Sequence, residues 1–473
     1  MHISRKRRGE RGQTMALVAV SLVSLLAMAA LAIDLVTLYT ARGQVERAAD
    51  SAALSAAKAL AAGGVTTDPT NSSSSPSNTW QVACAVATNE ATAVAGQNLV
   101  AGQTPNVTVT FPNAPAVDCS TQNVTSVFGI NPQVSVQVQV TGLPTFFSRI
   151  WSRATNTVSA TATAEAYNPS NSSTVSAGGI PAPVAASCVK PLLLPNCDPD
   201  RNHGLLACPN VGATTFIDKT SGAITSQGVY PAGIIGETFT LTSNCGGGPT
   251  CSPGAPTSTV GSPGNLKYYP IQIGNLGGYW CPGCYGSSST FEEDLACCNT
   301  TRLQCGVNGQ QYSTDTADPD PGSSGEATTA GQCLIHETAQ SYFPNCGSPM
   351  DQDCLDPTAS PFVMKAGSSN PLIGKTTGPP PTNPPTASSL VAGDQISTSD
   401  SVVSLPIYDS STGAAPASAT VIGFLQVFID DVNAAGTFTV TVLNVSGCGN
   451  GPSGSSQIFG AGPAIPVRLI QNP

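Results

Sequence analysis

Apolar and polar positions recur with different periods along the chain, and each period predicts a different kind of element. Residues 15–33 are a run of 19 positions without a charged side chain. As a helix this run spans about 28 Å at ~1.5 Å per residue, close to the ~30 Å hydrocarbon core of a bilayer. The run therefore predicts a transmembrane helix.

Residues 34–62 continue the run with a helical period and contain no proline. Apolar and small side chains recur every three or four positions, which predicts an amphipathic stem that continues the membrane helix and ends at Gly63-Gly64. Its small side chains either pack on the chain's own sheet or let a partner helix approach closely. The face comprises Leu38, Ala41, Val45, Ala48, Ala52, Ala56 and Ala59.

The next 100 residues predict a small sheet with a second helix. Residues 79–100 have a weaker helical period, and three segments then alternate apolar with polar positions, as half-buried strands do. Between the last two strands, residues 143–154 predict a short aromatic helix that caps the sheet or touches the membrane surface. The strands are expected at 106–111, 133–142 and 156–167.

The amino-acid composition changes after the polar linker at 168–179. Residues 180–473 are rich in Cys, Gly and Pro, and strand patterns return only near the end. Those strands suggest a β-meander or a small β-sandwich. They are expected at 401–409, 419–431, 436–447 and 465–471.

Together these patterns predict an α+β protein. A transmembrane helix continues into the stem, a small antiparallel sheet forms a head, and a β-rich, disulfide-containing region follows. The expected divisions are a basic tail at 1–14, the membrane helix at 15–33, the stem and head at 34–167, the linker at 168–179 and the β-rich region at 180–473.

Charge adds an orientation to this picture. Only 10% of the residues are charged, and the net charge is −10, yet the first twelve residues hold five basic side chains and one acid. The acidic body argues against a nucleic-acid partner. Basic residues beside an apolar run place that end in the cytoplasm, so the bulk of the chain is expected outside it.

A cleaved signal peptide is the alternative for the same segment. Ala30-Leu31-Ala32 has the small-residue form that permits cleavage before Ile33. The helical stem beyond Asp34 favours retention as an anchor. Asp34 itself is either an interfacial residue or a partner for a basic group on another membrane helix.

Cysteine usage agrees with an exported chain. Thirteen of the sixteen cysteines lie between Cys188 and Cys354. This concentration in a loop-rich region predicts a disulfide framework in an oxidising compartment. Cys281-Pro282-Gly283-Cys284 is also a CxxC motif, which could be a redox pair or half of a zinc site. Cys297, Cys298 and Cys305 are near enough in sequence to complete four ligands, but we expect plain disulfides.

The other candidate motifs are better explained as ordinary loops and turns than as functional sites. Residues 449–454 match GxGxxG after a strand, but Pro452 interrupts the motif and no helix follows, so we expect a glycine loop. Oxygen-rich stretches could bind calcium but match no defined loop, so solvated turns are expected. These stretches hold Asp198, Asp200 and His203, and Glu292, Glu293 and Asp294.

Histidine is scarce, which limits catalysis. The chain has only His2, His203 and His336. A Ser-His-Asp triad would need one of the last two, and no nucleophile-elbow sequence is present. We therefore expect no enzyme activity, no catalytic residue, no cofactor and no metal site; a metal-dependent envelope hydrolase is the alternative that stoichiometric metal would reveal.

The N-terminal motifs resemble those of a known family. Basic residues, "RGQ", the apolar span, Asp34 and the stem "QVERAADSAALSAA" together resemble the N-terminal module of TadE/TadG-like proteins of the Flp (Tad) pilus-assembly system. The resemblance covers about residues 5–62. A second, weaker resemblance at 130–166 lies in "TFFSRIWSRATNTVSATATAEA".

The resemblance implies a single-pass protein of the bacterial inner membrane with a large extracytoplasmic part. Such a protein assembles or anchors a thin pilus through contacts with other pilus-assembly membrane proteins, without a small-molecule substrate. Leu17 stands where prepilin-like members have an acid, so pilin-type trimming after Gly12 is not expected. A secreted adhesin with a cleaved signal peptide is the alternative function.

Overall fold

The computed structural model describes most of the chain in separate stretches. The described residues are 10–67, 79–112, 119, 131–143, 156–170, 184–199, 214–219, 221–231, 233–244, 264–274, 279–284, 289–305, 311–313, 324–337, 346, 351–356, 363–374, 376–377, 388–396, 398–410, 418–448, 458–459 and 464–470. The expected helix at 143–154 and most of the linker at 168–179 lie outside them.

The predicted membrane helix and stem form one continuous helix, α1 (Glu10–Ala62), of 53 residues. It ends where expected. The amide of Gly63 donates to the carbonyl of Ala59 at 3.0 Å, and Gly64 has a φ of +75°, a left-handed conformation that glycine adopts without strain. The short 3₁₀ turn η1 (Val65–Thr67) follows.

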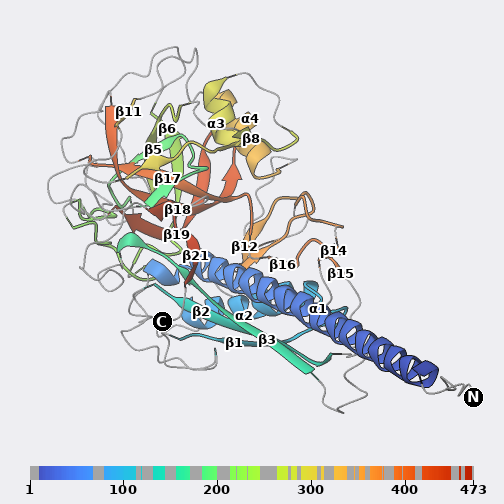
Figure 1. Cartoon of the computed structure of the whole chain (residues 1–473). Coiled ribbons are helices and arrows are strands. Elements are labelled where there is room, and N and C mark those ends of the chain that lie inside the picture. The colour runs from blue at the N-terminus through green and yellow to red at the C-terminus, as the bar shows by residue number, and fades with distance from the viewer. Residues whose placement is uncertain are drawn as a thin grey trace, which may run out of the picture.

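The two halves of α1 have opposite surroundings. From Met15 to Tyr39 its large apolar side chains are exposed, apart from the half-buried Leu38, and Figure 1 shows this half projecting away from the other elements. From Ala41 onward one face is buried in the chain's own core. Asp34 is only 3% exposed, although it lies in the mostly exposed half of α1.

The head surrounds the buried half of α1 with a second helix, α2 (Thr79–Gln97), and the predicted sheet. The sheet is antiparallel, with β1 (Asn106–Thr110), β2 (Gln133–Leu143) and β3 (Asn156–Ala166) in sequence order, which confirms the three predicted strands.

Small side chains let the layers of the head approach closely. Alternate valines of β2 and alanines of β3 are buried with the stem alanines in one core, so the small stem residues pack within this chain. The buried set is Ala41, Ala48, Ala52, Ala56, Val134, Val136, Val138, Val140, Ala162, Ala164 and Ala166.

The last strand does not join the other C-terminal strands. β21 (Val467–Ile470) pairs antiparallel with β3, with Leu469 opposite Ala164, and completes the head sheet in the order β1-β2-β3-β21. Its role in the head is stabilised by Arg468, whose Nε lies 2.5 Å from the Oε1 of the buried Glu165. The apolar pattern at 465–471 predicts a strand, but it does not show whether that strand pairs with β3 or with the other C-terminal strands.

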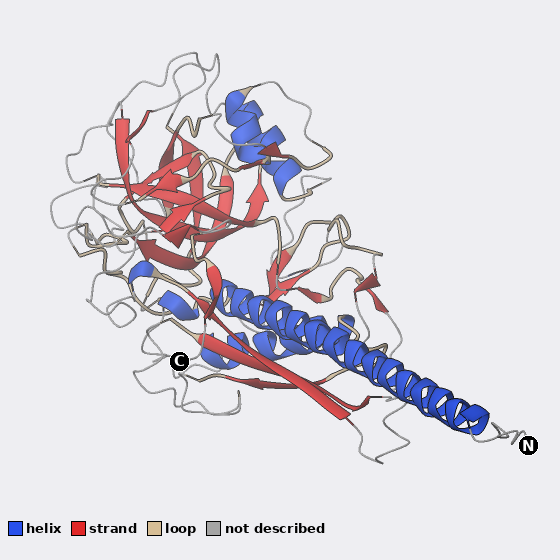
Figure 2. Cartoon of the chain, viewed as in Figure 1, coloured by secondary structure: helices blue, strands red, loops and turns tan. Residues whose placement is uncertain are grey.

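The other C-terminal strands belong to a six-stranded barrel. β17 (Val402–Tyr408), β18 (Ser418–Val432) and β19 (Phe438–Gly447) form the predicted meander. The circuit closes through β5 (Leu192–Pro195), β7 (Asn265–Pro270) and β6 (Thr238–Ser243), in the order β18-β17-β5-β7-β6-β19 and back to β18. A barrel therefore replaces the expected sandwich (Figure 2).

Closure of the barrel is favourable because it pairs strand edges that would otherwise be open. Three short segments from the loop-rich region supply the missing strands, and two of the contacts, β17–β5 and β6–β7, are parallel. Inward side chains from all six strands form one core. It includes Leu192, Leu241, Leu266, Leu405, Val427 and Val440.

Smaller elements lie outside the barrel and the head. Two short helices, α3 (Thr290–Ala296) and α4 (Ser324–Leu334), pack together above it in Figure 1. The remaining strands are β4 (Val184–Ala186), β8 (Tyr279–Trp280), β9 (Cys298–Asn299), β10 (Leu303–Gln304), β11 (Gln311–Ser313), β12 (Cys354–Asp356), β13 (Val363–Lys365), β14 (Thr376–Thr377), β15 (Ser388–Ser389), β16 (Gln395–Ile396) and β20 (Ile458–Phe459). The α+β class is thus confirmed.

A buried polar junction fixes the end of the stem to the barrel. Asn444 of β19 is fully buried, donates to the Ala61 carbonyl and to Gln426 Oε1, and accepts from Thr66 Oγ1 at 2.8 Å. Each group satisfied here would cost about 1–3 kcal/mol if left unpaired in the interior. The network therefore specifies how the stem and barrel meet.

Candidate functional site

The cysteines of the CxxC motif bond to other partners and not to each other. Cys281 bonds to Cys297, and Cys284 bonds to Cys333. The predicted disulfide use of the motif is confirmed, and no described cysteine is free to act as a redox thiol or zinc ligand. The four other disulfides between described cysteines are Cys84–Cys119, Cys188–Cys298, Cys305–Cys448 and Cys346–Cys354.

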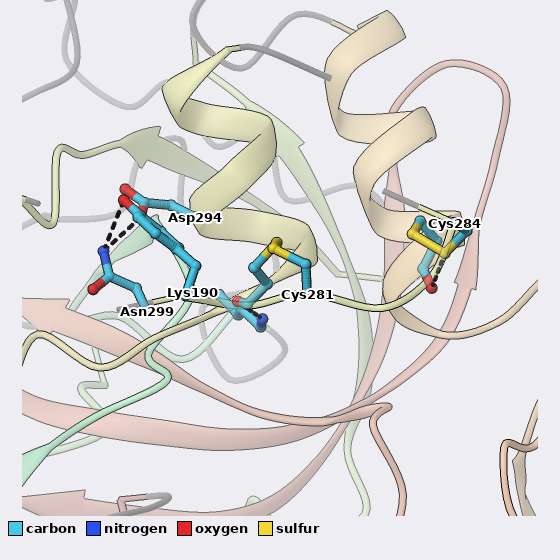
Figure 3. The surroundings of a disulfide bond; sticks show 8 residues. Lys190, Cys281, Cys284, Asp294 and Asn299 are labelled. Atoms are coloured by element: carbon cyan, nitrogen blue, oxygen red, sulfur yellow. Dashed lines mark hydrogen bonds between the residues drawn. A yellow bond between two sulfur atoms is a disulfide. The ribbon is translucent and has the colours of Figure 1, made fainter. Parts of the chain in front are cut away.

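The acidic "FEED" stretch forms the first turns of α3, capped by Ser289, whose side chain accepts from the Glu292 amide. Asp294 is buried beside Asn299, which donates to Asp294 Oδ1 at 2.7 Å, while the Tyr279 hydroxyl donates to the same oxygen at 3.2 Å (Figure 3). Burial raises the pKa of Asp294, and these hydrogen bonds oppose that rise. The expectation of a solvated turn is therefore wrong for this stretch, because it forms a helix in which Glu292 and Asp294 are buried.

The remaining sequence candidates are only partly placed. Asp198 is buried and accepts a hydrogen bond from Ser226 Oγ at 3.0 Å. The described residues contain no group of three or more His, Cys, Asp or Glu side chains arranged to hold a metal ion. Outside the described residues lie His2, Asp200, His203 and the glycine loop 449–454.

A cleft lies where the end of the stem, the barrel and the head strand β21 meet. Its volume is about 980 Å³, at the upper end of the ~300–1,000 Å³ typical of ligand pockets. The last turn of α1, the segment after β4, the turn after β8, the end of α4, the start of β17 and β21 all contribute walls. The cleft therefore exists only because the stem and the C-terminal region pack together.

Lys190 is the most unusual residue of this cleft. It is 4% exposed, and its Nζ donates one hydrogen bond, of 2.7 Å, to the carbonyl of Cys297, as Figure 3 shows. Burial lowers the pKa of Lys190 from 10.5 to about 8, although the charges of Asp400 and Asp294 oppose this. Among the described residues Lys190 belongs to no ion pair.

The cleft also holds a histidine–aspartate pair. His336 Nε2 lies 2.8 Å from Asp400 Oδ2. This hydrogen bond is the main cause that holds the pKa of Asp400 below its usual range, and the positive charges of Lys190 and Lys58 add to it. Asp400 is therefore ionised at neutral pH and supplies a negative charge to the wall of the cleft.

Two further basic residues line the cleft. Lys58 projects from the last turns of the stem, and desolvation by the surrounding walls lowers its pKa, against the influence of Asp400 and Glu90. Arg468 of β21 is paired with Glu165 and lies over the ring of Tyr167 at 4.9 Å. Three basic side chains thus line a cleft in which Asp400 is the one lining acid among the described residues.

This arrangement suits binding more readily than proton transfer. A buried ammonium group and two further cations can hold an anionic group, and an exposed Trp280, at 76% exposure, offers an apolar face at the rim. The described part of the chain gives His336 an aspartate partner but no serine. Within the described residues, the His336–Asp400 pair is therefore not part of a Ser-His-Asp triad.

Sequence reasoning missed this cleft. Lys190 lies in "CVKPLLLP", where a lysine beside a fully apolar strand in a chain with few charges is the one signal that could have drawn attention to it. The helical period of the stem marks Lys58 only as a polar position off its apolar face. Asp400 and Arg468 are far from Lys190 in the sequence. They reach the cleft only through the tertiary fold, which a local sequence pattern does not predict.

Comparison with known proteins supplies one family relationship. Residues 12–59 match the Tad family model, described as Flp pilus-assembly TadE/G-like. The match covers 48 of the 473 residues and lies wholly within α1. No curated protein and no solved structure matches the chain.

Proposed function

Because residues 12–59 carry the TadE/G-like module of Flp pilus assembly, we propose that this chain is a membrane-anchored component that assembles or anchors a pilus through protein contacts and without catalysis. Its bulk lies on the extracytoplasmic side of a bacterial inner membrane. Its partners are other membrane proteins of the same assembly.

The observation that carries this proposal is the contrast along α1. In the described residues it is the one helix long and apolar enough to cross a membrane. The exposed apolar stretch from Met15 to Tyr39 spans about 37 Å at ~1.5 Å per residue, between the ~30 Å hydrocarbon core and the ~40–45 Å full thickness of a bilayer. A lipid environment would cover this surface, and the head begins directly beyond it.

Charge and disulfides support the proposed orientation. Basic residues precede the span, which favours a cytoplasmic N-terminus. The six disulfides between described cysteines all form beyond the span, which suits an oxidising compartment on that side. The basic set is Arg5, Lys6, Arg7, Arg8 and Arg11.

Membrane extraction of the full-length chain tests the anchor. We expect the protein to resist carbonate extraction, to dissolve in detergent and to retain the mass of an uncleaved chain. In spheroplasts, externally added protease should digest the barrel while an epitope at the N-terminus stays protected. Protection of the barrel would contradict the orientation.

The same experiment separates the alternative, a secreted adhesin. Its specific support is the sequence Ala30-Leu31-Ala32, and cleavage there would leave α1 beginning at Ile33 with the buried stem intact. A soluble mature chain starting at Ile33 would support secretion and remove the anchor. An Ala32→Leu variant is the matched control: if the wild type is cleaved there, the variant should retain the first 32 residues, and if it is not, the mass should differ only by the Ala-to-Leu substitution.

Involvement in pilus assembly needs a separate test. Deletion of the gene in its host should reduce surface pili, and the full chain should restore them. A chain in which residues 15–33 are replaced by an unrelated single-pass span tests whether the family module contributes more than anchoring. Normal piliation in the deletion strain would overturn the proposed role.

A further inference from the structure

We propose that the cleft between the stem, the barrel and β21 binds an extended, acidic peptide segment of a protein partner, with a ligand carboxylate placed at Lys190. This inference deepens the proposed function, on which it rests, because it assigns the contact surface and the chemistry of the partner.

Lys190 is a buried cation that has no ion-pair partner among the described residues. An ammonium group removed from water is unfavourable unless charges and hydrogen bonds replace its hydration. Here one of its three donors is satisfied by the Cys297 carbonyl, and no carboxylate among the described residues forms an ion pair with it. The side chain lines the cleft, so a bound carboxylate can supply the missing counter-charge.

The charges around Lys190 favour an anion over a cation. Lys58 and Arg468 line the same cleft, and Asp400 is the opposing acid. Arg468 is already paired with Glu165, and Asp400 with His336, so the two lysines are the groups left to attract a ligand. Glu90 lies near Lys58 and Asp294 near Lys190, but neither forms an ion pair with the lysine it faces.

The shape of the cleft favours a peptide over a small anion. A volume of about 980 Å³ far exceeds what a phosphate or a single carboxylate needs. Trp280 is 76% exposed at the rim, and prolines contribute to the walls, so apolar side chains of a ligand have surfaces to contact. These prolines are Pro282, Pro371 and Pro466.

An open strand edge supplies the third element. β21 lines the cleft and, among the described strands, pairs on one side only, with β3. Extended peptides commonly add to such edges through main-chain hydrogen bonds, while side chains occupy neighbouring pockets. An added strand beside β21 would place its side chains alternately toward and away from the cleft, and acidic ones could reach the lysines.

Selection from a random peptide library tests the proposal even while the partner is unidentified. The detergent-solubilised full chain is immobilised and presented with a phage library of random twelve-residue peptides. We expect enriched peptides to contain Asp or Glu and to bind at least tenfold more weakly to Lys190→Met. The matched control, Lys219→Met, alters a surface lysine that does not line the cleft and should leave affinity unchanged.

A second variant checks the sign of the electrostatic effect. Asp400→Asn removes the opposing charge, so at pH 6, where Lys190 stays protonated, the selected acidic peptides should bind more tightly. Affinity that stays unchanged or falls in Asp400→Asn would contradict the proposal. Circular dichroism of both variants establishes that each is folded.

Three results would overturn the inference. These are the absence of any enriched peptide, enrichment of peptides without acidic residues, and equal binding by wild type and Lys190→Met. Inorganic phosphate and phosphatidylglycerol vesicles are tested in parallel, and Lys190-dependent binding of either without peptide binding would assign the site to a small anion or to lipid. All these outcomes are independent of pilus formation, so they are distinguishable from failure of the proposed function.

Discussion

At the scale of single residues, Lys190 combines a stability cost with a binding opportunity. Its burial makes the charged form unfavourable in the folded chain, which is why its pKa falls to about 8. Removing such a charge generally stabilises a protein, whereas removing a satisfied one does the opposite. A residue that weakens its own fold is more readily explained by what it binds than by packing.

Replacement of Lys190 by Met should change how stability depends on pH. Between the folded pKa of about 8 and the unfolded value near 10.5, the unfolded chain binds more protons, so the free energy of unfolding of the wild type rises with pH, by about 3 kcal/mol over the whole interval. Denaturant titrations between pH 7.5 and 9.5 should show this rise in wild type and a flatter profile in Lys190→Met.

The measurement stops at pH 9.5 for a physical reason. Burial raises the pKa of Tyr269 to about 12, so above pH 10 the folded chain retains protons that the unfolded chain loses, and stability falls there. If the free energy of unfolding depends on pH in the same way in wild type and Lys190→Met, burial does not lower the pKa of Lys190 as described.

At the scale of elements, small side chains determine how the stem packs. The stem is amphipathic through alanine more than through large apolar residues, and the alternating alanines of β3 oppose it in the same core. The sequence predicted this helical pattern and the period-two strands of the head. The final strand was also predicted, at 465–471, but its pairing with β3 was not, because the two strands lie about 300 positions apart, as the Arg468–Glu165 pair that joins them shows.

Enlarging one stem alanine should destabilise the head. Ala52 is fully buried, so Ala52→Leu forces extra volume into a packed layer and should cost about 1–3 kcal/mol, measured by chemical denaturation in detergent. Asp50→Leu, at an exposed position of the same helix, is the control and should change stability little. Equal effects of the two substitutions would show that the stem is not packed as described.

The Arg468–Glu165 pair offers a test of how β21 is held. Arg468→Met leaves the 1% exposed Glu165 without its counter-charge and should cost about 2–3 kcal/mol, below the ~3–5 kcal/mol of a fully buried pair because Arg468 is partly solvated. The double variant with Glu165→Leu should recover most of this loss. Additive losses in the double variant would contradict direct pairing.

At the scale of the whole molecule, disulfides hold together segments that have little regular structure of their own. The bond between Cys305 and Cys448 joins residues 143 positions apart, and such long loops give the largest constraint on the unfolded chain. The cysteine count predicted the framework but not its connectivity. Barrel closure escaped prediction for a related reason, since its three short strands lie among Gly- and Pro-rich loops.

Peptide mapping of the unreduced protein tests this connectivity. A digest analysed by mass spectrometry should contain cross-linked peptides that join Cys281 to Cys297 and Cys284 to Cys333. A peptide with an internal Cys281–Cys284 bond would contradict the structure and restore the redox interpretation of the motif. Alkylation before reduction should leave these four cysteines unlabelled, because they have no free thiol.

The unbroken course of α1 has a mechanical consequence. From Tyr39 at the edge of the exposed stretch to Lys58 at the cleft is about 28 Å of helix, at ~1.5 Å per residue, with no proline or loop between them. A pull on a ligand held at the proposed site would therefore be transmitted along one continuous helix to the proposed membrane span. The described part of α1 offers no break at which the two ends could move independently.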